Sequence, residues 1–530
     1  MVTELEYNLV QRITVGDIFR RNARHIPDKE AIVEKRGNEF IRLTYRQLNS
    51  HMNQFASALM NLGLSKGDKV ALIGPNSIEY VISLFGCTKT GIIAVPVNPI
   101  LNREDIKYML THSEAKALIA DDAFLGVAEQ VRESCPHIKT FISIPATKAT
   151  APSRYVDFYS FIEGMPDREP QAIIWERDPM WILYTSGTTA RAKGVVISHL
   201  TVYVTSLANL VEYQIARNFV GAILLPLFHS AQQACTTSFF HVGARTVLFR
   251  TLFDITEILA AIEREKISFI LALPMIWRAM LDHSQLKDYD VSSVERAMYA
   301  MTPMDQRTLQ QIAAHFTPNL FLGTGRTEFF PSTENFKPEW QFKKKGNYWG
   351  EPALTVETAI MDDNGNILPR GEVGEIVRRG PAHLIEYWKD PGATDATRKY
   401  GWDHSEDIGY FDEDGLLAFI DRKKDMIKTG GENVPSIKVE KALLADARIQ
   451  GAAVVGLPHE RWVEAITAFI VRQPGAKLTE DDVVKLCKEN LGGFEVPKKV
   501  VFLDALPITS TGKIKKNVIK DQYKDIYRDS

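Results

Sequence analysis

The chain has 530 residues, of which 45% are hydrophobic and 24% are charged, and its formal net charge is −3. This length is too great for one ordinary core, so we expect at least two folded units in a soluble globular protein. The overall charge gives no indication of a nucleic-acid partner.

The N-terminal region carries acids early and has no apolar run, unlike a secretory signal.

Further along, apolar residues recur at steps of three and four over residues 45–62, which predicts an amphipathic helix that ends at Gly63. Short, continuous apolar runs predict buried strands, and because helical segments separate them we expect parallel sheets covered on both faces. These runs lie at residues 70–73, 92–97, 117–120, 181–184, 222–225, 267–273 and 319–322. None is long enough to span a bilayer, so no integral membrane segment is expected.

The pattern changes after about Gly371. Short alternating strands are predicted at 375–377 and 416–420, and a charged hexapeptide follows at 421–426. A compact α+β pattern comes next, with a helix near 438–445, strands at 452–455 and 466–471, and a helix that Thr479 caps. We therefore expect a large domain over residues 1–422 and a small domain over residues 423–530, with a hinge near Lys424.

The four cysteines, Cys87, Cys135, Cys235 and Cys487, are widely scattered and none is in CxxC spacing. They predict neither a zinc site nor a disulfide framework and fit a reducing, cytoplasmic compartment.

A loop rich in hydroxyls and glycine follows the predicted strand at 181–184 and ends in Lys193-Gly194. Small residues let backbone N–H groups point at a polyphosphate, hydroxyls add donors, and the lysine adds charge. The spacing is not that of a Walker A loop, because Ala192 rather than glycine precedes Lys193. An unrelated P-loop NTPase is therefore disfavoured.

Residues 184–194 resemble the YTSGTTGxPKG signature of the adenylate-forming superfamily, which includes acyl- and aryl-CoA synthetases, peptide-synthetase adenylation domains and firefly-type luciferases. Further segments resemble the other motifs of that superfamily in the same order. They are LTYRQL at 43–48, PLFH at 226–229, TGRTE at 324–328, GWDHSED at 401–407, DRKKD at 421–425, GGENV at 430–434 and TGKI at 511–514. The resemblance covers roughly residues 20 to 520.

The resemblance implies an α/β fold: a large N-terminal AMP-binding domain of parallel-sheet subdomains with a small barrel-like β subdomain, and a small, mobile α+β C-terminal domain. It also implies a two-step reaction with Mg²⁺. A carboxylic acid and ATP give acyl-AMP and pyrophosphate, and coenzyme A then takes the acyl group. The expected partners are these small molecules, and the family allows a homodimer.

The resemblance further implies roles for single residues. Lys513 would stabilise the adenylation transition state, Glu328 would bind Mg²⁺, and His229 would border the acyl carboxylate. Asp407 would accept hydrogen bonds from the ribose, and Arg422 would contact ribose or phosphate. The full set expected at ATP is Thr185, Ser186, Gly187, Thr188, Thr189, Lys193, Thr324, Gly325, Arg326, Thr327, Glu328, Asp407, Arg422 and Lys513.

Two further groups follow from the resemblance. The acyl pocket would be lined by His229, Gln232, Gln233, Ala300, Met301 and Phe329, while Lys424 would be the hinge and Lys428, Gly430 and Gly431 would serve the coenzyme A step. The amides of Gln232 and Gln233 either favour a polar substrate group or face the backbone. A fatty acid, of medium or long chain, and an aromatic acid both remain open.

Several positions depart from the superfamily pattern. Ala190 and Ala192 replace a glycine and a proline of the phosphate loop, and Thr324 stands where an aromatic residue usually stacks on adenine. Glu406 and Val463 replace glycines. Two alternatives stay open. One is an adenylating enzyme with another acceptor, such as a carrier-protein thiol or oxygen. The departures keep open the other, a catalytically impaired relative that binds nucleotide or acyl chains.

Overall fold

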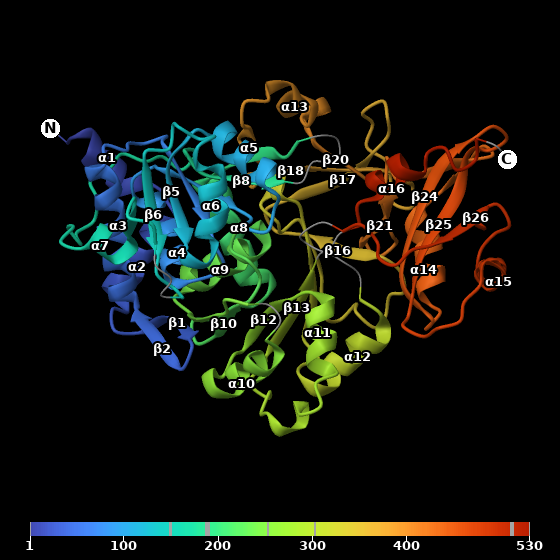
Figure 1. Cartoon of the computed structure of the whole chain (residues 1–530), viewed down its shortest axis with the longest axis horizontal. Coiled ribbons are helices and arrows are strands. Elements are labelled where there is room, and N and C mark those ends of the chain that lie inside the picture. Colours follow the sequence, from blue (N-terminus) through green and yellow to red (C-terminus); the bar gives the residue numbers. More distant parts are fainter. Residues whose placement is uncertain are drawn as a thin grey trace. The chain divides into compact units, whose positions relative to one another are not determined.

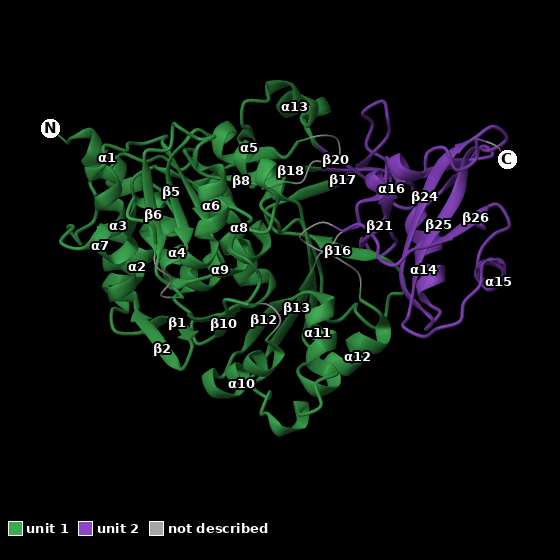
Figure 2. Ribbon diagram, in the orientation of Figure 1, with its two compact units in different colours: residues 1–358, 378–403 green, residues 359–377, 404–530 purple. Residues whose placement is uncertain are grey.

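The computed structural model describes residues 2–147, 151–185, 191–251, 254–300, 304–508 and 514–528. The chain divides into two compact units, one of residues 1–358 with 378–403 and one of residues 359–377 with 404–530 (Figure 2). The expected domain boundary between residues 422 and 423, with its hinge, stays a prediction.

The first unit contains an eight-stranded sheet in the order β19-β9-β8-β4-β3-β5-β6-β7. Its strands β5, β6 and β8 are labelled in Figure 1. Its strands from β8 to β7 pair in parallel, whereas β9 pairs antiparallel with both β8 and β19. The continuous apolar runs predicted the parallel strands β8, β4, β3 and β5, but β6 and β7 were not predicted. The bounds are β3 Lys69–Ile73, β4 Ile93–Val97, β5 Ala115–Asp121, β6 Thr140–Ile144, β7 Tyr155–Asp157, β8 Pro179–Thr185, β9 Lys193–Ser198 and β19 Glu386–Tyr387.

A second sheet of this unit runs in the order β16-β15-β14-β13-β12-β10-β11-β1-β2. The strands from β14 to β1 are parallel, and β2, β15 and β16 are antiparallel to their neighbours. The bounds are β1 Glu30–Arg36, β2 Glu39–Thr44, β10 Val220–Ile223, β11 Arg245–Leu248, β12 Phe269–Ala272, β13 Arg296–Ala300, β14 Leu320–Thr324, β15 Glu334–Phe336 and β16 Tyr348–Pro352.

Helices connect and cover these strands. They are α1 Glu4–Gln11, α2 Gly16–His25, α3 Tyr45–Asn61, α4 Ile78–Gly86, α5 Arg103–Ser113, α6 Leu125–Arg132, α7 Phe158–Ile162, α8 His199–Glu212, α9 Ser230–Val242, α10 Ile255–Glu265, α11 Pro274–Leu281, α12 Gln306–His315 and α13 Pro391–Ala396. Helix α3 confirms the predicted amphipathic segment. A capping box of Thr44 and Gln47 starts it, and Gly63, at φ +81°, follows its C-cap.

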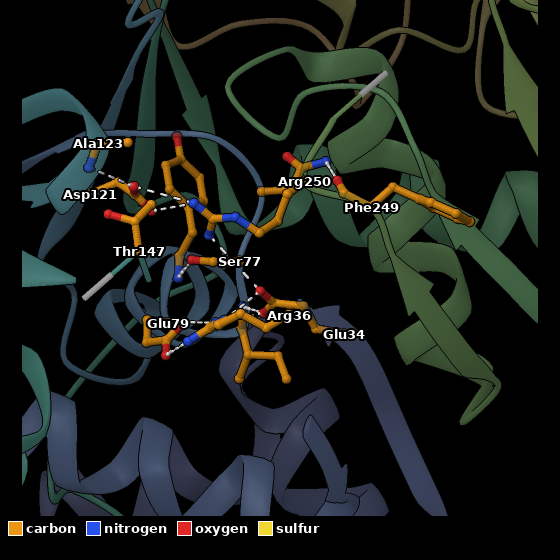
Figure 3. Close-up of polar contacts among 12 residues, drawn as sticks. Glu34, Arg36, Ser77, Glu79, Asp121, Ala123, Thr147, Phe249 and Arg250 are labelled. Atoms are coloured by element: carbon orange, nitrogen blue, oxygen red, sulfur yellow. Dashed lines mark hydrogen bonds and ion pairs between the residues drawn. The ribbon is translucent and has the colours of Figure 1, made fainter. Parts of the chain in front are cut away.

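A buried ionic network joins the two sheets of the first unit (Figure 3). At the end of β5, Asp121 accepts a hydrogen bond of 3.0 Å from Arg250, which follows β11 and also lies 3.9 Å from Glu34 of β1. Arg36 binds both Glu34 and Glu79 of helix α4 at 2.8 Å. Because burial raises the pKa of Glu34 and Asp121, these carboxylates depend on the arginines for compensation.

Most residues of four strands belong to the second unit. These strands are β17 Glu357–Met361, β18 Gly374–Arg379, β20 Asp403–Phe411 and β21 Leu417–Arg422. The unit also holds a five-stranded sheet of β22 Ile427–Thr429, β23 Glu432–Val434, β24 Ile449–His459, β25 Val463–Arg472 and β26 Lys499–Phe502. Its helices are α14 Ser436–Leu444, α15 Glu480–Asn490 and α16 Lys516–Tyr523. The predicted mixed α/β fold, with a smaller α+β C-terminal part, is confirmed.

All four cysteines are buried free thiols. Within the ranges that the structure describes, no helix combines the length and the apolar character that crossing a membrane requires.

Candidate active site

The predicted phosphate loop connects two antiparallel strands. Thr185 at the end of β8 pairs with Lys193 at the start of β9, and Tyr184 pairs with Gly194. The sequence pattern did not indicate that an antiparallel strand follows the loop, because an apolar strand before a loop is compatible with either a hairpin or a following helix. The predicted loop residues Ser186, Gly187, Thr188 and Thr189, together with Ala190, lie outside the described residues.

Lys193 and Glu328 are brought to one place by a residue that the sequence did not single out. The Tyr387 hydroxyl donates a hydrogen bond of 2.8 Å to Glu328 Oε1, and Lys193 Nζ lies 4.8 Å from the centroid of the Tyr387 ring. Tyr387 belongs to the short strand β19, which pairs with Val195 of β9. Only this pairing of distant segments reveals its position, so a local motif could not have found it.

Glu328 lies in the short 3₁₀ helix η4, Thr327–Phe329, beside Arg326. Arg326 Nε donates to Glu328 Oε2 at 3.2 Å, and Arg326 Nη1 donates to the buried Asp403 at 3.0 Å. Burial alone would raise the pKa of Glu328, but the charge of Arg326 and the hydrogen bonds from Arg326 and Tyr387 outweigh burial and lower it. Glu328 is therefore held as a carboxylate.

A single carboxylate fits the way in which Mg²⁺ binds, because this ion usually takes one or two protein carboxylates together with substrate phosphates. Among the residues that the structure describes, no group of three or more His, Cys, Asp or Glu is arranged to hold a metal ion by itself. Glu328 is therefore the acid whose chemistry fits an ion that arrives with a nucleotide.

The turn after β14 is fixed by a close backbone approach and a buried ion pair. A Cβ on Gly325 would lie 2.6 Å from Pro331 Cα, so only glycine fits there. Thr324, which replaces the usual aromatic residue, donates to the Glu334 carbonyl at 3.1 Å and to its carboxylate at 3.2 Å. Arg378 binds that carboxylate through two hydrogen bonds of 2.7 and 3.0 Å. Thr324 therefore contributes to holding the turn.

His229 occupies the N-cap position of helix α9, and its ring lies 4.7 Å from that of Phe228. Both neighbouring amides face the backbone of their own segment. Gln232 accepts from Leu225 N–H at 2.9 Å, and Gln233 Nε2 donates to the Leu227 carbonyl at 2.8 Å. Of the two alternatives for these amides, the geometry favours the backbone-facing one.

The other residues predicted for the acyl pocket are distributed over several elements. Ala300 ends strand β13 and is 6% exposed, and Met301 lies outside the described residues. Phe329 is fully buried in a cluster with Ala353, Val356 and Ala382. Thr327 approaches Ser230, the first residue of α9, with 3.4 Å between their hydroxyl oxygens. These contacts join η4 to the start of α9.

In the second unit, Asp407 and Arg422 lie directly opposite each other on the antiparallel strands β20 and β21. Arg422 Nε is 3.4 Å from Asp407 Oδ1. The pairing brings together the two residues predicted for the ribose. Glu406, in place of the usual glycine, has φ +59°, so the left-handed backbone persists without glycine.

The glycines predicted for the coenzyme A step lie beside Trp462. Gly430 N–H donates to the Trp462 carbonyl at 2.8 Å, and both Gly430 and Gly431 have positive φ. The Trp462 ring is flanked by Arg461 at 4.7 Å and Lys498 at 5.0 Å. This surface of one indole and two cations was not predicted from the sequence.

Two lysines complete this part of the chain. Lys428 N–H donates to Glu464 Oε2 at 2.7 Å, and burial lowers the pKa of Lys424, the predicted hinge residue. Lys513 lies outside the described residues.

Comparisons with known proteins agree over nearly the whole chain. The model of the AMP-binding enzyme family matches residues 19–388, and that of the AMP-binding enzyme C-terminal domain matches residues 438–513. The chain is 32% identical to 4-hydroxybutyrate–CoA ligase 2 of Metallosphaera sedula, covering 96% of this chain and 94% of the relative. It is 31% identical to the long-chain-fatty-acid–CoA ligase FadD13 of Mycobacterium tuberculosis, covering 96% and 98%. The solved anthranilate CoA ligase AuaEII in complex with anthranoyl-AMP superimposes with a TM-score of 0.87 at 25% identity, over 98% of this chain and 99% of that one.

Proposed function

The chain belongs to the AMP-binding enzyme family, as an AMP-forming acyl-CoA synthetase, and from this premise we propose a two-step reaction at the residues described above. A carboxylic acid attacks the α-phosphorus of ATP and releases pyrophosphate, and the acyl group of the resulting adenylate then passes to coenzyme A with release of AMP. The observation that carries the proposal is the ionised Glu328, held by Arg326 and Tyr387 next to Lys193.

In the first step, a carboxylate oxygen of the substrate forms a bond to the α-phosphorus, and the bond from that phosphorus to the pyrophosphate oxygen breaks. Negative charge increases on the phosphate oxygens, so a positioned cation stabilises the transition state more than the ground state. We assign this work to Lys513, with Lys193 at the phosphate loop. Glu328 would hold Mg²⁺, which supplies charge neutralisation at the phosphates when it is bound.

We assign the remaining nucleotide contacts to residues of the second unit and of the TGRTE segment. The Asp407 carboxylate would accept hydrogen bonds from the ribose hydroxyls, and Arg422, its cross-strand neighbour, would supply a fixed positive charge. Arg326 keeps Glu328 ionised and oriented, so we assign it a positioning role. The fixed turn at Gly325 would present its backbone to the adenine side.

In the second step, the coenzyme A sulfur attacks the acyl carbon, and the bond to the AMP oxygen breaks. We assign Lys428, Gly430 and Gly431 to this step. Their support is the neighbouring Trp462, whose ring and two flanking cations suit a ligand that carries both an aromatic base and phosphates.

For the acid, the relatives' names span a short hydroxy acid, long-chain fatty acids and an aromatic acid. We infer that this chain takes a fatty or an aromatic acid, because Ala300 and Phe329 are buried and apolar while the amides of Gln232 and Gln233 bind the backbone.

The test is an AMP-release assay with a panel of carboxylic acids, run with and without coenzyme A. We expect at least one acid to give AMP release that depends on coenzyme A, and to support ATP–pyrophosphate exchange without it. The variant Glu328→Gln keeps the hydrogen bond from Tyr387 but lacks the charge, and it should lose most of both activities. Pyrophosphate exchange without any AMP release that depends on coenzyme A would indicate a carrier-protein acceptor. No exchange with any acid would refute the proposal in favour of a binding protein.

A further inference from the structure

The hairpin of β8 and β9, which carries the predicted phosphate loop, has two distinct faces. Residues that pair across antiparallel strands project to the same face, and neighbours along a strand project to opposite faces. The pair Thr185–Lys193 therefore lies on one face, where Lys193 approaches Tyr387. The pair Tyr184–Gly194 lies on the opposite face, which is the back of the hairpin as seen from Lys193.

Helix α5 binds the back of the hairpin through Tyr184. The Tyr184 hydroxyl oxygen lies 2.9 Å from Nδ1 of His112, in the last turn of this helix. Burial lowers the pKa of His112 and raises that of Tyr184, so a neutral hydroxyl and a neutral imidazole share this hydrogen bond. Trp388 connects the same helix to β9, because its indole N–H donates to the His112 carbonyl at 2.9 Å and its backbone N–H donates to the Gly194 carbonyl at 2.7 Å. Helix α5 is thus bound to both strands of the hairpin.

Tyr108, one helical turn before His112, contacts the other end of the loop. The guanidinium carbon of Arg191 lies 5.2 Å from the centroid of the Tyr108 ring, within the range of a cation–π interaction. The Tyr108 ring stacks on His112, with 5.0 Å between the centroids, and stands edge-on to Tyr184 at 6.4 Å. Tyr184, before the loop, and Arg191, near its end, therefore meet two neighbouring side chains of one helix.

The superfamily pattern has a proline at position 192, where this chain has Ala192. Proline fixes φ and so restricts the conformations of a loop, whereas alanine does not. We propose that Tyr108 and His112 are positioning residues that fix the two ends of the phosphate loop, and with them Lys193, in place of the missing proline. They act through the side chains at the loop ends and not by contact with the nucleotide. This inference rests on the proposed function and adds two residues to it.

The experiment measures the Kd for ATP by isothermal titration calorimetry and the KM for ATP in pyrophosphate exchange. His112→Ala and Tyr184→Phe each remove one partner of the same hydrogen bond, so ATP must itself order the loop end when it binds. Each variant should raise the Kd by about three- to tenfold, and the double variant should raise it no further. Tyr108→Leu should raise the Kd by about two- to fivefold. The KM for ATP should rise in parallel, while the KM for the acid stays close to that of the wild type.

Ala192→Pro supplies the missing restraint by another route. In the wild type, whose loop ends are already held, it should change the Kd for ATP little. In the His112→Ala background it should recover about two- to fivefold of the lost affinity. A role of His112 in the stability of α5 alone predicts no such recovery.

The matched control is His137→Ala. His137 Nε2 donates to the Leu110 carbonyl of α5 at 3.1 Å, so this variant removes a histidine hydrogen bond of the same helix that does not involve the loop ends. Its melting temperature should fall as that of His112→Ala does, with the Kd for ATP unchanged.

The inference is refuted if Tyr184→Phe and Tyr108→Leu bind ATP as tightly as the wild type does, or if Ala192→Pro recovers no affinity in the His112→Ala background. If the wild type binds no ATP, the proposed function and the inference fail together. ATP binding by the wild type that all the variants keep refutes the inference alone.

Discussion

Val463 should destabilise the second unit through its backbone conformation, and replacing it with glycine should reverse the effect. It has φ +68°, a region that β-branched residues rarely occupy, and it begins strand β25 opposite His459. The left-handed conformation costs about 1–2 kcal/mol for a residue with a side chain. Glycine removes this strain but loses more backbone freedom on folding, at about 0.5–1 kcal/mol. Because Val463 is 70% exposed, little apolar burial is lost.

The net expectation for Val463→Gly is a stabilisation of about 0.5–1 kcal/mol, taken from the difference between those two terms. In a unit of this size that raises the melting temperature by about 2–3 °C. Differential scanning calorimetry measures the transition, and native-state hydrogen exchange of the β24–β25 amides assigns the change to this hairpin.

Glu460→Gly is the matched control, because Glu460 lies in the same hairpin, is exposed, and is absent from the positive-φ residues of the described chain. It should lower stability by about 0.5–1 kcal/mol, the ordinary effect of glycine. Glu406→Gly should behave like Val463→Gly, since Glu406 has φ +59°. If Val463→Gly is no more stable than Glu460→Gly, the reasoning from backbone strain is wrong.

Three further predictions concern charge. Arg326→Gln removes the charge that offsets the effect of burial on the pKa of Glu328, so this pKa should rise. The acid limb of the pH profile of pyrophosphate exchange should then move to higher pH, and an unchanged limb would contradict this assignment. Lys513→Ala should reduce adenylation by about 10²–10³ while thioester formation from supplied acyl-AMP continues, and equal loss of both steps would exclude our role for Lys513. Three arginines outweigh burial and lower the pKa of Glu265 to about 2, so its stabilising effect is full above pH ~4.5 and is lost as pH falls towards 2; Glu265→Gln should flatten the dependence of urea unfolding on pH over that window.

Local patterns in the sequence predicted eleven strands and three helices of the fold. The step pattern that ends at Gly63 gave helix α3, and the capping residue Thr479 gave α15, because both signals act within one or two turns of helix. The apolar runs located the strands but not their pairing partners. The antiparallel return at Thr185 and Lys193 depends on contacts that no periodicity within the strands specifies.

The candidate site shows the same division. The resemblance of the TGRTE segment to the superfamily motif indicated Glu328 and Arg326, and the structure places their side chains in contact. Tyr387 and Asp403 bind these same side chains from distant segments, so no local pattern could indicate them. The loop residues Ser186 to Thr189 and Lys513 stay predictions.

The ionic network between the two sheets of the first unit should affect the order in which this unit loosens on heating. The unfavourable dehydration of charged groups weakens as temperature rises, whereas apolar burial gains little. The ion pair Arg250–Asp121 should therefore contribute a growing share of the cohesion between the sheets at high temperature, as should Arg36–Glu79 between β1 and helix α4. We expect the peripheral helices of this unit to loosen first, and the sheets to separate from each other last.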